Sequence, residues 1–293
     1  MQKFDLIEPT SFDEAFEILG REEARVIGGG TALMVLLKNR LLSPRYLVGL
    51  RKMAGLAALK PSSTGISFGA CTRLRDIENS TLVSDRLPLL SAAVGHIGNM
   101  RVRSAALVGG TLCEADYQSD FSVALVALGS RVRARGRRGE RLIPIEDFYT
   151  GPYTTALDAG EVVTEVEVEA APQGASSAYL KCVTGPITDR PCVAVAAIIG
   201  LDAAGRCVHF RLVVGGVNGF SSLPLRVKAA EQLAAGSEIT DQIVDAACDI
   251  ACNEADPASD LKAPAWYKKK MIGVFCRRAL QDALAQEKRR LGA

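Results

Sequence analysis

Two glycine-rich segments in the first half of the chain restrict its fold more than any other feature. Gly28-Gly29-Gly30-Thr31 follows the strand-like residues 23–27 and precedes residues 32–39, which have the composition of a helix. Gly109-Gly110-Thr111 follows the strand-like residues 101–108 in the same way. Glycine permits positive φ and close approach of the backbone, so successive N–H groups can point at an anion. Each segment therefore predicts a phosphate-binding turn, although a tight turn without a ligand explains either one alone equally well.

The first segment lacks the marks of two common nucleotide sites. It has neither the Lys-Ser/Thr pair of a P-loop nor the third glycine of the Gly-x-Gly-x-x-Gly fingerprint, which disfavours ATP and NAD sites of those types. Hydrogen bonds to a charged group contribute about 1.5–3 kcal/mol each, so two such turns can hold a diphosphate without a cluster of basic residues. This agrees with the charge balance of 35 Lys plus Arg against 33 Asp plus Glu, which favours neither nucleic acid nor an anionic membrane as a partner.

A shift in composition to linker residues at 170–176 divides the chain into two parts. In the first part we expect alternating helices and strands: helices at 11–20, 73–79, 88–97 and 120–128, strands at 46–50, 65–69, 70–72 and 161–169, and a hairpin over 131–145. In the second part we expect a small antiparallel sheet covered by helices. Its strands are predicted at 178–183, 192–201 and 207–215, and its helices at 223–235, 241–253 and 265–286.

Cysteine and histidine usage argues against metal sites in this chain. The eight cysteines include no Cys-x-x-Cys pair and no spacing suited to zinc or an iron–sulfur cluster, so we expect them to be reduced. His96 and His209 are too few for a histidine-based metal centre, and we interpret both as structural. The apolar run 193–201 is too short to span a bilayer and the acidic N-terminus does not suit a secretory signal. A cytoplasmic location is expected.

An arginine-rich stretch offers an alternative interpretation, nucleic-acid binding. Residues 131–141 hold six arginines. Their period-two alternation places Val132 and Ala134 on one face of a strand and the arginines on the other, and no aromatic residues interleave to stack bases. We therefore interpret the stretch as a solvated hairpin face or a subunit contact.

Three segments, taken together, resemble the FAD-binding motifs of the molybdenum hydroxylase family, as found in the medium subunit of carbon monoxide dehydrogenase and the flavin domain of xanthine dehydrogenase. They are Val26–Leu33 with Lys38-Asn39, Ile97–Arg103 and Leu107–Asp120. Further along, Glu161–Val166 resembles the strand that flanks the flavin and Tyr179–Lys181 the start of the C-terminal domain. Asp260, Tyr267 and Arg277–Leu280 resemble the last helix of that domain. The resemblance covers nearly the whole chain in the same order.

The resemblance implies an α+β fold with two domains. Residues 1–172 would form a two-part FAD-binding domain of the vanillyl-alcohol-oxidase (PCMH) type, with subdomains at about 1–55 and 56–172. Residues 173–293 would form a C-terminal domain of the carbon monoxide dehydrogenase flavoprotein type, a small antiparallel sheet with helices.

The resemblance also implies which residues bind FAD, without a covalent bond and with no catalytic side chain or metal in this chain. The FAD diphosphate would be surrounded by Arg25, Val26, Ile27, Gly28, Gly29, Gly30, Thr31, Ala32, Leu33, Gly109, Gly110 and Thr111. Asp120 would accept hydrogen bonds from the adenosine end, and Asp116 of the same motif is included among the binding residues. Ile97, Leu107 and Cys113 would line the cofactor, with Val162, Val163 and Lys181 against its other side.

The chain departs from the family pattern at several of these positions. Ala32 stands where many relatives have a polar or acidic residue, Thr111 where Asn is common, and Tyr117-Gln118 where Pro-Ala is frequent. Arg190-Pro191 replaces a more usual Asp-x-Ala. Thr111 keeps a hydrogen-bond donor and acceptor, so these changes affect individual side-chain contacts. The chain has no cysteine-rich insertion of the kind found in some aromatic-CoA reductase relatives.

The implied function is electron transfer within a complex. A large subunit with a molybdopterin cofactor would oxidise the substrate, a small subunit with two 2Fe-2S clusters would relay electrons, and this chain would pass them from FAD to an external acceptor. The expected assembly is a dimer of heterotrimers. Two alternatives remain open: a stand-alone FAD-dependent oxidase or dehydrogenase with its own substrate pocket, and a scaffold subunit without cofactor. Lys181, considered without the resemblance, is equally well a surface lysine.

Overall fold

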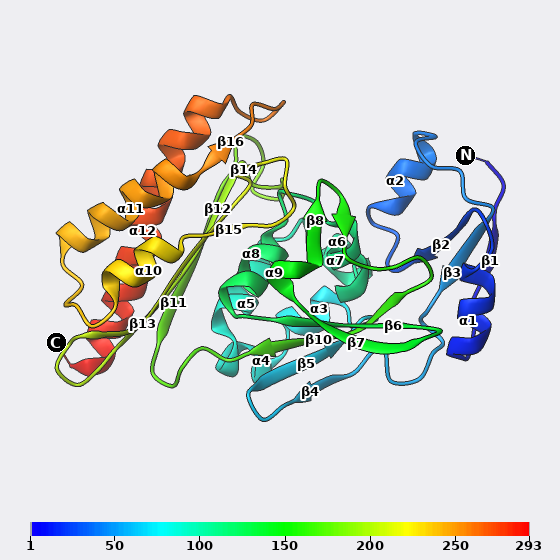
Figure 1. Cartoon of the computed structure of the whole chain (residues 1–293), viewed down its shortest axis with the longest axis horizontal. Helices are drawn as coiled ribbons and strands as arrows, with labels where there is room; N and C mark the ends of the chain where they lie inside the picture. The colour runs from blue at the N-terminus through cyan, green and yellow to red at the C-terminus, as the bar shows by residue number, and fades with distance from the viewer. Residues whose placement is uncertain (1, 293) are drawn as a thin grey trace.

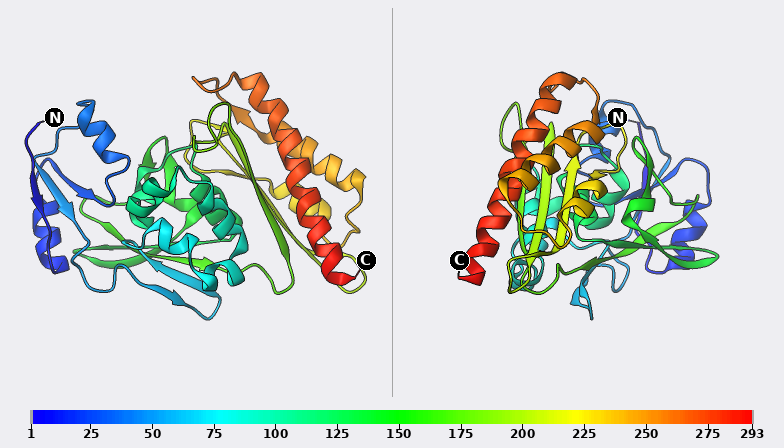
Figure 2. Two further views of the ribbon diagram at one scale, coloured as in Figure 1. Left: turned by 180° about the vertical axis from the view of Figure 1, so that it is seen from behind. Right: turned by 60° about the vertical axis from the view of Figure 1, so that its left-hand side comes forward.

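A computed structural model describes residues 2–292, and three larger sheets follow one another along the molecule (Figure 1). The N-terminal sheet lies at one end. The middle sheet is covered by a group of helices, and the C-terminal sheet stands between those helices and the last helices of the chain (Figure 2). The expected α+β fold, with a small antiparallel sheet and helices at the C-terminal end, is confirmed. Within residues 2–292, no helix is both long and apolar enough to cross a membrane.

The N-terminal sheet is parallel and is covered by a short amphipathic helix. Its strands, in spatial order, are β1 (Asp5–Ile7), β3 (Tyr46–Gly49) and β2 (Ala24–Ile27). The Ser11 side chain accepts a hydrogen bond from the amide of Glu14 and so caps α1 (Phe12–Leu19). Helix α1 buries its apolar face in one cluster with Val48 of the central strand. Strand β2 leads into the first glycine segment, and α2 (Leu33–Lys38) follows it.

The middle sheet is antiparallel and has a charged face and an apolar face. Its five strands, in spatial order, are β4 (Leu59–Pro61), β5 (Gly65–Gly69), β10 (Val162–Glu169), β6 (Arg131–Gly136) and β7 (Gly139–Pro144). Along β10 the buried Val166 and Val168 alternate with half-buried glutamates, because successive side chains of a strand point to opposite faces. The expectation of a half-exposed strand here, and of a hairpin over 131–145, is confirmed.

The apolar face of the middle sheet is covered by a layer of short helices. Val166 and Phe68 of the sheet share one apolar cluster with Phe121 and Leu90 of these helices. The layer comprises α3 (Leu74–Glu78), α4 (Thr81–Arg86), α5 (Pro88–Gly95), α6 (Met100–Ala105), α7 (Val108–Glu114) and α8 (Asp120–Ala127). A short link of α9 (Ile145–Phe148), β8 (Tyr149–Gly151) and β9 (Thr154–Thr155) joins β7 to β10.

The C-terminal sheet is antiparallel and is buried on both faces. Its strands, in spatial order, are β11 (Ser176–Cys182), β12 (Val193–Leu201), β13 (Cys207–Gly215) and β15 (Leu225–Arg226). All nine residues of β12 are buried. Ala194 and Ala196 belong to the cluster formed with the α5 and α8 side, whereas Val193 and Val195 belong to the cluster on the other side. That second side is covered by α10 (Lys228–Ala234), α11 (Asp241–Glu254) and α12 (Ala265–Leu291).

Some predicted elements are wrong. Residues 101–108, predicted as a strand, form most of helix α6 and the start of α7, so the second glycine pair lies in the first turn of a helix. Residues 70 and 71 form a turn and residue 72 belongs to no regular element, so the strand predicted over 70–72 is absent. The helix predicted over 223–235 begins only at Lys228, because residues 225–226 pair with β13 as β15. A short parallel pair, β14 (Asn218–Gly219) with β16 (Asp256–Pro257), was not predicted.

Candidate functional site

The two glycine segments lie side by side although they are far apart in sequence. A Cβ atom at Gly28 would lie 3.4 Å from the Cα of Gly110. The amide of Gly109 donates to the carbonyl of Ala70 at 2.8 Å, which fixes the second segment on the end of β5. The ends of two sheets therefore bring both predicted phosphate-binding turns to one place.

The glycines of these segments are required for different reasons. A Cβ at Gly29 would lie 1.8 Å from the carbonyl oxygen of Ala105, so the backbone there packs directly against the end of α6. Gly30 has φ +74°, which glycine adopts without strain. A Cβ at Gly110 would meet only ordinary contacts, at 3.8 Å from Gly28 Cα, and this residue is exposed. Packing therefore explains Gly29 but leaves Gly110 unexplained.

Both glycine segments carry free backbone amides. Among the residues that the structure describes, the amides of residues 29–32 and of Gly110 donate to no protein acceptor. Backbone N–H groups without a protein partner require water or a ligand. Several such groups directed from adjacent turns form a concave anion site. The donors present therefore fit a diphosphate.

A cavity of about 260 Å³ opens beside the glycine segments. This volume is slightly below the range for pockets that enclose a drug-sized ligand, so a cofactor as large as FAD extends beyond it. The cavity is lined by both apolar side chains and carboxylates. The lining residues come from both glycine segments, from α3, from α6 and α7 with the loops around them, and from the β11–β12 loop of the C-terminal sheet: Thr31, Ala32, Leu74, Ile97, Gly98, Val102, Ala106, Thr111, Glu114, Asp116, Gln118, Ser119, Asp120, Thr188, Asp189 and Arg190.

The structure brings some of the predicted FAD-binding residues together at this cavity and leaves others outside its lining. Those at the cavity are Thr31, Ala32, Ile97, Thr111, Asp116 and Asp120. Leu107 is buried directly behind Gly28, while Arg25 and Val26 are exposed on β2 and Cys113 is exposed on α7. Ile27 is half-buried at the end of β2, and Leu33 begins α2. Val162 and Val163 are buried in apolar clusters of β10, outside the cavity lining.

Asp120 and Lys181 form a buried ion pair at the edge of the cavity. The Lys181 Nζ donates to Asp120 Oδ2 at 3.3 Å and to the carbonyl of His96 at 2.8 Å. The Tyr179 hydroxyl donates to the other carboxylate oxygen at 2.5 Å. Burial raises the pKa of Asp120 to about 6, against the opposing effects of Lys181 and Tyr179. The Lys181 side chain is fully buried, so the alternative of a surface lysine is wrong.

His96 occupies the end of a helix, as expected. It is the C-cap of α5 and packs against the Tyr179 ring, with 5.8 Å between ring centroids. Burial and the nearby Lys181 lower the pKa of His96. Its imidazole is therefore neutral at pH 7, which agrees with a structural role.

Sequence reasoning missed two ion pairs that shape the cavity. Arg103 donates from Nε and one Nη atom to the two carboxylate oxygens of Glu78, at 2.7 and 2.8 Å. Its other Nη atom donates to the carbonyls of Ile97 and Gly98. Arg190 pairs with Asp116, a buried carboxylate. The sequence analysis named Arg103 as the last residue of a motif and Arg190 as a departure from the family pattern. It could not identify their carboxylate partners, because these are distant in sequence.

The arginines of the β6–β7 hairpin are largely neutralised within the sheet. Arg133 and Arg131 both pair with Glu167 of β10, and Arg131 lies 3.3 Å from it. Arg141 pairs with Glu161 at 2.8 Å. Cross-strand pairing of this kind uses the charges that a nucleic acid would need, so the nucleic-acid alternative finds no support.

Within residues 2–292 there is also no group of His, Cys, Asp and Glu side chains able to hold a metal ion.

Comparison with protein families matches both parts of the chain. Residues 2–170 match the family described as "FAD binding domain in molybdopterin dehydrogenase". Residues 178–283 match the "CO dehydrogenase flavoprotein C-terminal domain". The first match alone covers more than half of the chain.

Characterised proteins and solved structures match over almost the whole length. The glyceraldehyde dehydrogenase medium chain of Sulfolobus acidocaldarius is 31% identical over 96% of this chain and 98% of that protein. The carbon monoxide dehydrogenase medium chain of Afipia carboxidovorans is 30% identical, covering 97% and 98%. The structure of carbon monoxide dehydrogenase from Hydrogenophaga pseudoflava, which lacks the Mo-pyranopterin moiety of its molybdenum cofactor, superposes with a TM-score of 0.92 at 30% identity, covering 97% and 98%.

Another solved structure agrees. Quinoline 2-oxidoreductase from Pseudomonas putida 86 superposes with a TM-score of 0.91 at 26% identity, covering 98% of each chain. These matches confirm the expected enzyme class, an oxidoreductase subunit, and the expected cofactor of this chain, FAD. The chain belongs to the family of FAD-binding medium subunits of molybdopterin-dependent dehydrogenases, the molybdenum hydroxylases.

Proposed function

We propose that this chain is the FAD-carrying electron-transfer subunit of a heteromeric molybdenum hydroxylase. It receives electrons from the 2Fe-2S clusters of a small partner subunit and passes them to an external acceptor, while a large subunit with the molybdopterin cofactor oxidises the substrate. The observation that carries the proposal is the meeting of two glycine segments in which the amides of residues 29–32 and of Gly110 have no protein acceptor. Relatives named as medium chains of dehydrogenases support the division of labour.

The residues of this chain bind and orient the cofactor. Bound FAD exchanges electrons both singly and in pairs, which suits a link between iron–sulfur clusters and a two-electron acceptor. The amides of residues 29–32 and of Gly110 would hold the diphosphate. Asp116 and Asp120, with Thr31, Thr111 and the apolar Ile97, would contact the cofactor at the cavity.

The remaining predicted contacts belong to the same proposal. Arg25 to Leu33 would flank the first glycine segment, Leu107 would support it from behind, and Cys113 would lie near the second. Three further residues would support the cofactor site without being exposed to it, because they are buried: Val162, Val163 and Lys181. Lys181 would then act through Asp120, to which it is hydrogen-bonded, and not by direct contact.

The proposal extends to the organisation of the protein. We place the FAD-binding domain at residues 1–172, with subdomains at about 1–55 and 56–172, and the C-terminal domain at 173–293. The assembly would be a dimer of heterotrimers in the cytoplasm. The stand-alone oxidase finds little support, because the C-terminal part contributes only the loop residues 188–190 to the cavity lining.

The experiment that tests the function compares the chain with and without its partners. The protein is purified with any subunits that accompany it, and its flavin content is read from the visible spectrum. Bleaching of the flavin by an organic substrate is then followed with the large and small subunits present and after their removal. Electron transfer to the flavin only in their presence supports the proposal. Oxidation of an organic substrate by this chain alone would favour the stand-alone enzyme, and absence of flavin would favour the scaffold.

A further inference from the structure

The segment that joins α7 to α8 forms one wall of the cavity. Asp116, Gln118, Ser119 and Asp120 all line it. The segment begins at Ala115, which has φ +48° and ψ +43°, a left-handed conformation that is unfavourable for a residue with a Cβ. A backbone in such a conformation persists only when surrounding contacts hold it. The shape of this wall therefore depends on what holds residues 115–120.

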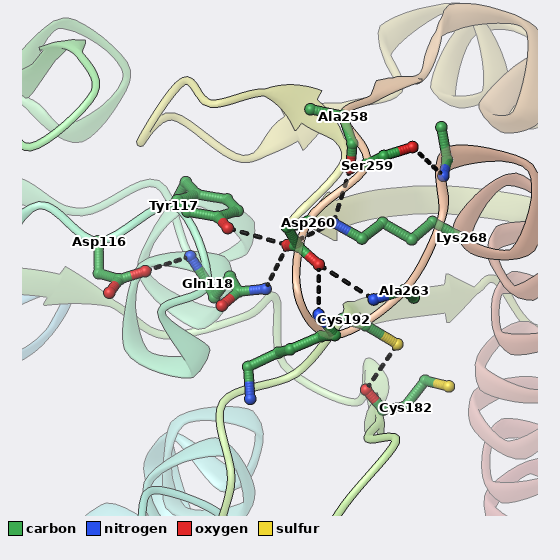
Figure 3. Close-up of polar contacts among 12 residues, drawn as sticks. Asp116, Tyr117, Gln118, Cys182, Cys192, Ala258, Ser259, Asp260, Ala263 and Lys268 are labelled. Carbon is green, nitrogen blue, oxygen red and sulfur yellow. Dashed lines mark hydrogen bonds and ion pairs between the residues drawn. The ribbon is translucent and has the colours of Figure 1, made fainter.

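One carboxylate of the C-terminal part holds the centre of this segment (Figure 3). Asp260 Oδ2 accepts hydrogen bonds from the Tyr117 hydroxyl at 2.9 Å and from Gln118 Nε2 at 3.2 Å. Its other oxygen accepts from the amides of Lys262 and Ala263, at 2.9 and 3.0 Å. Tyr117 and Asp260 are 143 residues apart in sequence. The contact therefore joins the FAD-binding part to the C-terminal part.

Asp260 lies in the loop before α12, not in the last helix as the resemblance implied, and it is itself fixed to that helix. Lys268 of α12 donates to Asp260 Oδ2 at 2.7 Å and to the carbonyl of Ala258 at 2.9 Å, and Lys268 is only 1% exposed. Although burial alone would raise it, the pKa of Asp260 is held at about 2 by Lys268 and the backbone amides. The carboxylate is therefore ionised at neutral pH and accepts hydrogen bonds only. Ile272 and Cys276, further along α12, lie in the apolar core, so the anchor is rigid.

Other side chains of the C-terminal part hold the rest of the segment. Ser222 donates to the carbonyl of Ala115, and Arg190 pairs with Asp116. Tyr179 and Lys181 hold Asp120. Contacts from the C-terminal part thus reach the segment at both ends and at its centre.

We propose that Asp260 is a positioning residue for the cofactor cavity, holding Tyr117 and Gln118 so that the 115–120 segment keeps the conformation that binds FAD. This inference rests on the proposed function, because it takes the cavity to be part of the FAD site. Asp260 does not line the cavity and acts through the residues that it holds. The C-terminal part thereby takes part in cofactor binding without supplying most of the contacts.

Tyr117→Phe tests the proposal with the smallest change. It removes only the hydroxyl that donates to Asp260. Loss of a hydrogen bond to a charged group costs enough free energy to weaken FAD binding about ten-fold if the loss frees the segment. The matched control is Tyr149→Phe. Tyr149 is buried and its hydroxyl lies 2.8 Å from Ser122 Oγ, within the FAD-binding part. The dissociation constant of FAD, the visible circular dichroism of bound FAD and the urea midpoint are measured for each protein.

We expect Tyr117→Phe to raise the FAD dissociation constant and alter the circular dichroism of bound FAD, and Tyr149→Phe to lower only the urea midpoint. Gln118→Met, which removes the second donor at similar volume, should resemble Tyr117→Phe. The double variant Asp260→Asn with Tyr117→Phe should lose less FAD-binding free energy than the sum of the losses in the two single variants, because both changes remove the same contact.

The outcomes separate this inference from the function on which it rests. Wild-type affinity and circular dichroism in both Tyr117→Phe and Gln118→Met would overturn the positioning role while leaving FAD binding intact. Equal weakening in Tyr117→Phe and Tyr149→Phe would also overturn it, because a general loss of stability then suffices. A wild-type protein without FAD, even with its partner subunits, would overturn the proposed function and this inference with it.

Discussion

Gly29 and Gly110 differ in what requires a glycine: packing requires it at Gly29, whereas we propose that cofactor binding requires it at Gly110. We expect Gly110→Val to abolish FAD binding with little loss of fold, because its Cβ meets only ordinary contacts while the branched side chain would cover the free amides. Gly110→Ala should bind FAD weakly, whereas Gly29→Ala should unfold the N-terminal part through its clash with Ala105. Flavin content and far-ultraviolet circular dichroism distinguish the three. Full flavin content in Gly110→Val would contradict the site.

The ionised state of Asp260 predicts a pH dependence of stability. Its pKa of about 2 in the folded protein is below the value of about 4 in an unfolded chain, so it stabilises the fold above pH 4 and this contribution is lost as the pH falls toward 2. The contribution is about 2 kcal/mol. In Asp260→Asn the free energy of unfolding should be lower at pH 7 and should fall less steeply between pH 4 and 2. Urea unfolding at several pH values measures this. Asp282→Asn, at an exposed position, is the control for the loss of one charge. An unchanged loss of stability between pH 4 and 2 in Asp260→Asn would contradict the prediction.

At the scale of elements, the close packing of α8 on β13 predicts a pair of compensating changes. A Cβ at Gly215 would lie 2.3 Å from Cγ2 of Val123, a stiff side chain in the core. Gly215→Ala should therefore destabilise the protein by about 1–3 kcal/mol, and Val123→Ala should recover part of this in the double variant. Gly95→Ala, where a Cβ meets nothing within 4 Å, is the control and should be neutral or stabilising. Urea denaturation measures all four variants; additive losses in the double variant would show that the clash is not the cause.

The elements that sequence reasoning predicted are specified by their own residues, whereas most of those that it missed depend on pairing with distant segments. Long periodic segments such as α11 and β12 were predicted because their own residues specify them. Strands β1 and β15 have three and two residues and exist only through pairing with a neighbour, so no local pattern marks them. Helix α6 was mistaken for a strand although a local signal was present, since the Asn99 side chain caps it.

The candidate site shows the same limit at the scale of the whole molecule. The glycine segments were found because glycine chemistry is local, and the resemblance to the molybdenum hydroxylases supplied the cofactor. The partners of Arg103, Arg190 and Asp260 were not found, because each contact joins segments whose proximity only the complete fold decides. The sequence thus indicated the two segments that we propose bind the phosphates, whereas the walls that shape the cavity required the structure.

A cavity with walls from both parts of the chain predicts that FAD stabilises both parts. FAD at about one hundred times its dissociation constant should add about 2.7 kcal/mol to the free energy of unfolding. Because residues 188–190 and the network of Asp260 belong to the C-terminal part, slower hydrogen exchange should reach residues 184–192 and 258–268 as well as residues 28–34 and 107–120. Exchange measured by mass spectrometry with and without FAD tests this, and β7, remote from the cavity, is the internal control. Protection confined to residues 28–34 and 107–120 would mean that the C-terminal part does not share in binding, since a ligand protects the segments whose opening releases it.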